Sequence, residues 1–176
     1  MPHAIYDLNP VDRITTDAVG EPGNRVFYIQ ARKGSRLVTL ICEKEQLAAL
    51  AFAVDQLLVA LAGDKPEAVA EPDPAIDGGM GLEVPLAPVF RTGQLSLGYD
   101  QVSRRLVVVA HELTEEGQEG RPSVARFWAT PAQMRAFSIQ GQQVVAAGRP
   151  RCAMCGEPID PAGHFCPRKN GDRKTQ

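Results

Sequence analysis

The chain has 176 residues, a length that fits one domain of ordinary size with a small appendage. Hydrophobic residues make up 44% of the sequence and charged residues 23%, which is close to the globular average and excludes extensive disorder, collagen and a long coiled coil. The formal net charge of −2 gives no overall field toward nucleic acid or anionic lipid, and 6% aromatic residues are few for a base-stacking platform.

The sequence predicts a soluble, cytoplasmic protein. Its start lacks the basic residues and apolar core of a signal peptide. The longest apolar stretch, 47–62, is interrupted by Asp55 and Gln56 and is shorter than the ~20 residues of a membrane span. Three of the four cysteines lie in the last 25 residues, a distribution that favours metal binding over a secreted disulfide framework.

The first half of the chain predicts a hairpin followed by a helix. Two β-rich runs, 25–30 and 37–42, flank a turn at 33–35. An apolar stripe at helical spacing follows, and Gly63 suits the end of that helix. The stripe consists of Leu47, Leu50, Val54, Leu57, Leu58 and Leu61.

Residues 64–87 interrupt this pattern. They contain six acidic residues, one basic residue and four prolines, which is typical of an acidic, mobile linker.

The second half repeats strands and a helix. Strands are expected at 89–91, 95–97, 105–111 and 124–128, with a turn at 98–100. Thr130, Pro131 and Gln133 form a helix start with a capping box. Ile139 and Gly141 fit the apolar face less well, so we expect this helix to kink or to end early.

The two halves align without a gap where residues 40–50 are laid on 127–137, although any strand–helix junction of similar length would align comparably. We therefore predict an α+β fold for residues 1–148. Two β-β-α units, 25–63 and 104–148, would form an antiparallel sheet with both helices on one face. Residues 149–176 would form a zinc-binding tail.

The strongest motif lies in that tail. Cys152 and Cys155 have knuckle spacing and are followed by Gly156, which permits the tight turn and N–H bonds to thiolate. His164 and Cys166 are two residues apart, so in extended chain both can reach one ion. A redox dithiol, and a fourth ligand other than His164, are the alternatives.

Three sulfurs and one nitrogen form a closed tetrahedral set, which favours a structural Zn²⁺ ion. The tail is too short to have a core, so metal binding would supply its folding energy. Its basic residues could contact phosphates or the acidic residues 64–77, but no fold motif supports nucleic-acid binding. These residues are Arg149, Arg151, Arg168, Lys169, Arg173 and Lys174.

No catalytic motif is evident in the sequence. His111 and Glu112 lack the second histidine of a zincin, and Cys42 is interpreted as a core residue. The preferred hypothesis is a non-catalytic binding, adaptor or regulatory protein. The alternatives are an enzyme with a site near Tyr99, Asp100, His111 and Glu112, and a zinc-knuckle nucleic-acid binder.

Six stretches together resemble a bacterial, mainly actinobacterial, family of unknown function with a C-terminal zinc knuckle. They are 5–7, 20–23, 27–32, 43–46, 90–100 and 152–167, so the resemblance covers nearly the whole chain. It implies a cytoplasmic protein of this length and carries no established activity. It also suggests a kinase-like protein as partner.

Overall fold

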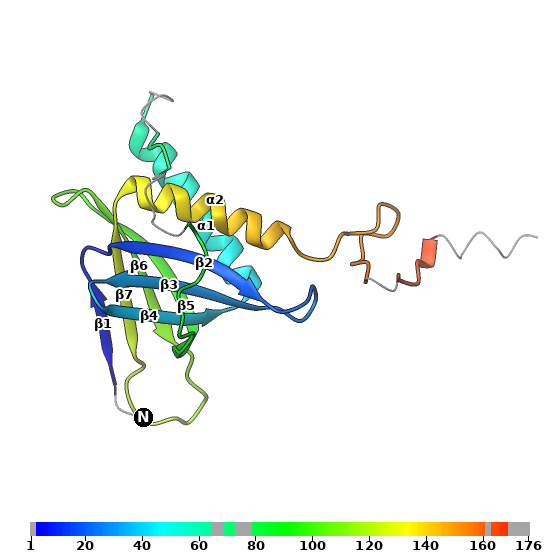
Figure 1. Cartoon of the computed structure of the whole chain (residues 1–176), viewed down its shortest axis with the longest axis horizontal. Coiled ribbons are helices and arrows are strands. Elements are labelled where there is room, and N and C mark those ends of the chain that lie inside the picture. The colour runs from blue at the N-terminus through cyan, green and yellow to red at the C-terminus, as the bar shows by residue number, and fades with distance from the viewer. Residues whose placement is uncertain (1–2, 65–68, 73–78, 161–162, 169–176) are drawn as a thin grey trace, which may run out of the picture.

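The computed structural model describes residues 3–64, 69–72, 79–160 and 163–168, and has an α+β fold (Figure 1). Seven strands form one sheet in the order β1-β7-β6-β5-β4-β3-β2. The elements in chain order are β1 (Ile5–Leu8), β2 (Arg13–Val19), β3 (Val26–Lys33), β4 (Arg36–Cys42), α1 (Lys44–Ala62), β5 (Pro88–Asp100), β6 (Arg105–Glu112), β7 (Val124–Ala129) and α2 (Pro131–Ala146).

The sheet is mixed, so the prediction of a purely antiparallel sheet is wrong. β1 pairs with β7 in parallel, and the first residues of β5 pair with β4 in parallel. Residues 92–100 of β5 pair antiparallel with β6, with an irregularity between Thr92 and Gln94. The parallel pairs join segments that are far apart in sequence, so no local turn signal indicates them.

The link between β1 and β2 shows that the sheet is curled. The Val11 N–H donates to the Trp128 carbonyl at 2.8 Å, beside one edge, and the Asp12 N–H donates to the Arg32 carbonyl at 2.8 Å, near the other. Two segments that lie at opposite ends of the strand order are therefore brought together. Inside the curl, α2 contacts both β2 and β6.

Alternating strand residues and one face of each helix form the apolar core. The largest of the fully buried side chains are Leu8, Ile14, Ile29, Leu40, Leu47, Leu106, Phe127, Met134 and Phe137.

The two helices pack against each other, and α2 continues without a break from Pro131 to Ala146. The expected kink or early end is therefore wrong. A Cβ on Gly141 would lie only 3.2 Å from the Cβ of Ala51, so glycine permits the close approach of the helices. The end of α1 is confirmed, because Gly63 follows it with a φ of 62°.

Among the described residues, α1 is the one helix that is long and apolar enough to cross a membrane by length and composition. Its most apolar window has a mean hydropathy of 1.5 and is 28% buried. Leu47, Leu50, Val54 and Leu58 of this helix lie in the core.

Part of the expected linker is packed against the sheet, in contrast to the mobile segment that its composition predicts. Residues 79–83, which we call the strap, lie against β2 and β3. Gln30 accepts a hydrogen bond from the Glu83 N–H at 2.7 Å and donates to the Glu83 carbonyl at 3.0 Å. Arg13, which is 5% exposed, donates to the carbonyls of Gly79 and Gly81. Buried polar groups of the sheet thus find their partners in the strap.

The two helices begin in the same way. Gln46 accepts a hydrogen bond from the Glu43 N–H at 2.8 Å and donates to the Gly93 carbonyl at 3.1 Å. Gln133 accepts from the Thr130 N–H at 2.9 Å and donates to the Val11 carbonyl at 3.2 Å. Each glutamine therefore caps its own helix and also ties it to a segment from the other half of the chain.

We expect Gln46→Ala and Gln133→Ala each to lower the free energy of unfolding by about 1–2 kcal/mol, because each loses a cap and a bond to a backbone carbonyl of a distant segment. Urea unfolding of the purified chain measures this. Gln56→Ala is the matched control, because Gln56 is exposed on α1. Equal stabilities of Gln46→Ala and Gln56→Ala would contradict the bridging role.

Candidate metal centre

A short backbone hairpin forms the first half of the Cys/His cluster. Arg151 and Pro158 make a β-bridge, and the Cys152 N–H donates to the Glu157 carbonyl at 2.8 Å. Gly156 closes the turn with a φ of 77°, a conformation that favours glycine, and its N–H donates to the Cys152 carbonyl. The two cysteines of the Cys-x2-Cys motif are thereby held on one loop.

A second reversal brings the other two ligands back to this loop. Asp160 and Gly163 form a bridge, and the Gly163 N–H donates to the Asp160 carbonyl at 2.8 Å. Gly163 has a φ of 94°. The extended chain that follows carries His164 and Cys166 to the sulfurs of the first loop.

The four predicted ligands lie together. Their ligand atoms are all within 4.8 Å of one another. The sulfurs of Cys152 and Cys166 are 3.9 Å apart, and the Cys155 sulfur is 3.4 Å from His164 Nε2. Ligands around a tetrahedral zinc, with bonds of about 2.3 Å to sulfur and 2.0–2.1 Å to nitrogen, are separated by about 3.5–3.8 Å. The cluster therefore has the dimensions to hold a metal ion.

The electrostatics of the first loop favour a thiolate at Cys152. Hydrogen bonds from the backbone N–H groups of Cys155 and Met154 lower the pKa of Cys152 to about 6. The sequence predicted such bonds from Gly156, whose N–H instead binds a carbonyl. A thiolate is the form in which cysteine binds metal.

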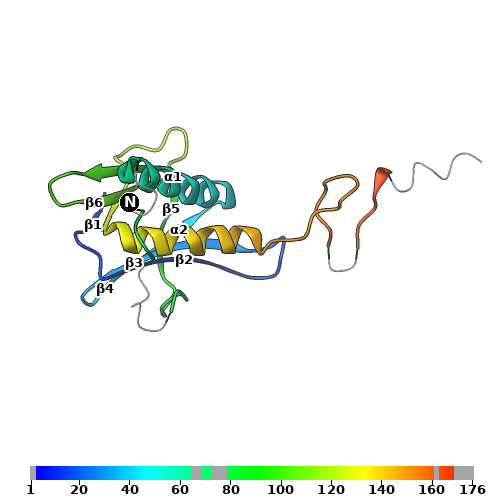
Figure 2. The same ribbon diagram turned by 90° about the horizontal axis from the view of Figure 1, so that it is seen from above.

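The tail around the cluster has little apolar packing of its own. Met154 is 47% exposed and Phe165 is 75% exposed, whereas Cys166 is buried. Figures 1 and 2 show the tail extending from the end of α2, away from the sheet. An ion pair of 2.6 Å between Arg149 and Asp160 joins the start of the tail to its second reversal. Four protein ligands leave no open coordination position, so this geometry suits a structural ion rather than a catalytic one.

The structure does not bring Tyr99, Asp100, His111 and Glu112 together. The prediction that they form one site is therefore wrong. In the β5–β6 pairing, Asp100 faces Arg105 at one end and His111 faces Gln94 toward the other. The predicted turn at 98–100 is also wrong, because β5 continues to Asp100. The Asp100 carboxylate accepts from the Ser103 hydroxyl at 2.6 Å, which lowers its pKa and stabilises the turn at 101–104.

Cys42, the remaining cysteine, is confirmed as a core residue. It is 2% exposed, and burial raises the pKa of its thiol to about 12. It lies in β4 and takes no part in the cluster of the tail.

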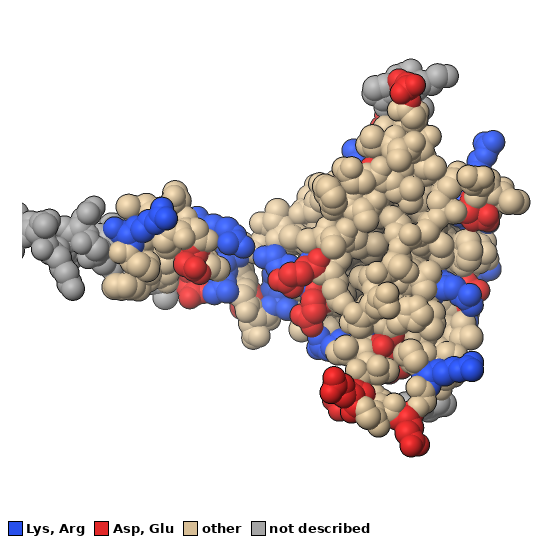
Figure 3. Space-filling model, turned by 180° about the vertical axis from the view of Figure 1, so that it is seen from behind, with Lys and Arg blue, Asp and Glu red and all other residues tan. Residues whose placement is uncertain are grey.

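Of the basic residues predicted in the tail, Arg149, Arg151 and Arg168 are described. Lys169, Arg173 and Lys174 lie outside the described residues. Figure 3 shows basic side chains on the tail and at its junction with the body, beside acidic ones.

The fold and the cluster define an α+β protein with a C-terminal Cys/His group that can hold a metal. Residues 6–166 match a family described as a protein of unknown function (DUF3090), and the chain belongs to that family. No curated protein and no solved structure matches the chain.

Proposed function

We propose that this protein holds one structural Zn²⁺ ion and acts as a non-catalytic binding or adaptor module. The observation that carries the proposal is the closed set of three sulfurs and one imidazole nitrogen, with separations that suit tetrahedral coordination. Zinc is the metal preferred by such a donor set. The ion would fasten a tail that buries few apolar side chains of its own.

The binding role concerns another protein, and a kinase-like protein is the candidate that the family resemblance suggests. The separation of the Tyr99–Asp100 pair from His111 and Glu112 supports a non-catalytic role over the enzyme considered in the sequence. We further propose that the protein works in the cytoplasm, where reduced thiols favour zinc over a disulfide. The matching glutamine caps of α1 and α2 support an origin of the body from two copies of one unit.

The first test is metal analysis of the purified full chain. Mass spectrometry under native conditions should give one zinc ion per chain, and elemental analysis should give the same ratio. A chain that carries no metal, with a disulfide between Cys152 and Cys155, would overturn the proposal in favour of a redox dithiol. The binding role is tested by affinity capture in which a co-purifying protein is identified and its complex is reconstituted from purified components.

A further inference from the structure

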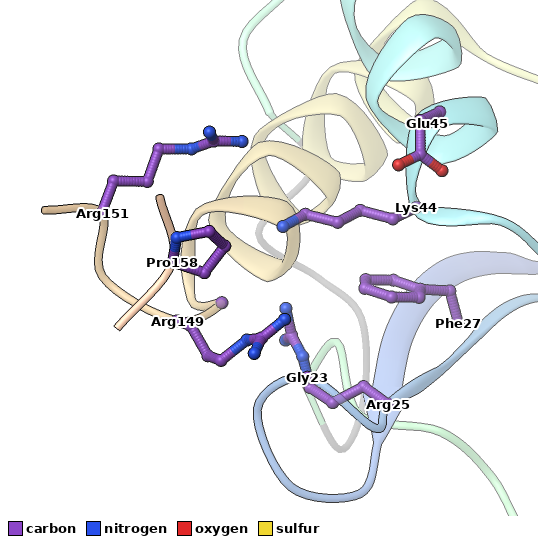
Figure 4. Close-up of a pocket in the computed structure, with 9 residues that line it drawn as sticks. Gly23, Arg25, Phe27, Lys44, Glu45, Arg149, Arg151 and Pro158 are labelled. Carbon is purple, nitrogen blue, oxygen red and sulfur yellow. The ribbon is translucent and has the colours of Figure 1, made fainter. Parts of the chain in front are cut away.

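A cavity of about 280 Å³ lies where the tail meets the body (Figure 4). The body contributes Arg25 and Phe27 from β3 and the loop before it, and Lys44 from the first residue of α1. The tail contributes Arg149 and Arg151. Segments from three distant parts of the chain therefore form one hollow, which no local sequence motif indicates.

The lining of this cavity is strongly basic. Arg25, Lys44, Arg149 and Arg151 supply four positive charges, and Glu45 is the carboxylate among the lining residues. In Figure 4 the Glu45 carboxylate lies across the cavity from the guanidinium groups of the tail. Asp160 pairs with Arg149, so an excess of two positive charges is left within the hollow.

Two of the cations approach the same point without an intervening carboxylate. A Cβ placed on Gly148 would lie 3.0 Å from Lys44 Nζ and 3.3 Å from Arg25 Nη2. Among the described residues, neither Arg25 nor Lys44 forms an ion pair with a carboxylate. Like charges held this close repel each other, and a bound anion would relieve the repulsion.

The Arg25 guanidinium is held in position before any ligand arrives. It donates to the Val144 carbonyl near the end of α2 at 3.0 Å, and it lies 4.9 Å from the centre of the Phe27 ring. On the other wall, a Cβ on Gly23 would come within 2.8 Å of Arg149 Nε, so glycine makes room for that side chain. An arginine fixed by such contacts loses little conformational freedom when it binds an oxyanion.

We propose that this cavity binds the phosphate group of a small phosphorylated molecule. Arginine forks match the oxygen geometry of phosphate, and lysine adds a point charge. Lys44 and Glu45 are also the first two residues of α1, where backbone N–H groups lack intrahelical partners. The volume suits a compact ligand rather than a polymer.

The inference rests in part on the proposed metal site. Arg149, Arg151 and Pro158 belong to the tail, and Arg151 and Pro158 form the bridge that begins the first ligand loop. Metal binding would therefore set the position of one wall of the cavity, whereas Arg25 and Lys44 belong to the body.

Isothermal titration calorimetry of the full, zinc-loaded chain with pyrophosphate as the probe tests the proposal. We expect binding that weakens with added salt. Arg25→Gln and Lys44→Gln should each weaken it by about tenfold to hundredfold, as for loss of charge-assisted interactions, without changing the zinc content, because both residues belong to the body. Arg104→Gln, an exposed residue on the β5–β6 turn, is the control and should bind as the wild type does. Absence of binding, or equal binding by all variants, would overturn the proposal.

Two further measurements distinguish this proposal from nucleic-acid binding and from the metal proposal. A short single-stranded RNA that binds more tightly than pyrophosphate, with sensitivity to Arg25→Gln, would overturn the assignment to a small molecule and indicate nucleic acid. Pyrophosphate binding that is lost in Arg25→Gln, in a chain that holds no zinc, would overturn the metal proposal and leave the cavity standing. A zinc-loaded chain that does not bind pyrophosphate would overturn the cavity proposal and leave the metal proposal standing.

Discussion

Replacing Cys155 by serine should remove the metal and unfold the tail while the sheet and helices stay folded. Zinc binding supplies about 10 kcal/mol or more to small zinc-binding peptides, and the tail has few buried apolar side chains that would replace this energy. The body has its own core, to which the tail contributes little, so its unfolding midpoint in urea should change only slightly.

Hydrogen exchange gives the readout for the tail. The amides of Cys152, Gly156 and Ile159 donate to backbone carbonyls within it, and we expect them to be protected in the zinc-loaded wild type and to exchange freely in Cys155→Ser. Cys42→Ala is the matched control: it removes a core thiol, so it should lower stability but keep one zinc ion per chain. Protected tail amides in a metal-free Cys155→Ser chain would contradict the structural role of the metal.

The metal cluster could be predicted from the sequence because all four ligands lie within one short segment. The spacing from Cys152 to Cys155 and from His164 to Cys166 requires only a tight turn and an extended chain, both of which are local properties. The basic cavity could not be predicted in the same way. Arg25 and Lys44 meet the tail only after the whole body has folded, and surface arginines and lysines carry no distinctive pattern.

The helices and the two hairpins were predictable for the same local reason, since the cap at Thr130 and the end at Gly63 are encoded by neighbouring residues. The strands β1 and β2 were not predicted. β1 pairs in parallel with β7, more than a hundred residues away, and β2 buries polar side chains such as Thr15 and Thr16 that hide the usual alternation of polar and apolar residues.

The composition of residues 64–87 predicted a mobile linker. The packing of the strap could not be predicted from that segment, because its polar partners Arg13 and Gln30 lie in other parts of the chain.

Gln30→Ala should lower the free energy of unfolding by about 2–4 kcal/mol and release the strap from the sheet. Gln30 is 1% exposed, and its amide also donates to the Thr39 hydroxyl at 3.0 Å. Truncation leaves the buried hydroxyl and both half-buried backbone groups of Glu83 without their partner, and each unpaired group is costly where water has limited access.

Urea unfolding measures the stability, and limited proteolysis of the native chain reports whether residues 79–83 are released. Gln30→Leu keeps most of the side-chain volume without the amide, so it should be destabilised and cleaved much as Gln30→Ala is, if the hydrogen bonds hold the strap. Gln101→Ala, in the exposed turn between β5 and β6, should behave as the wild type does. Wild-type resistance to cleavage in Gln30→Leu would instead show that the hydrogen bonds of Gln30 are not needed to hold the strap. Its other contacts, the Arg13 bonds to the Gly79 and Gly81 carbonyls and the ion pairs of Glu83 with Arg13 at 3.5 Å and with Arg32 at 3.2 Å, would then be sufficient.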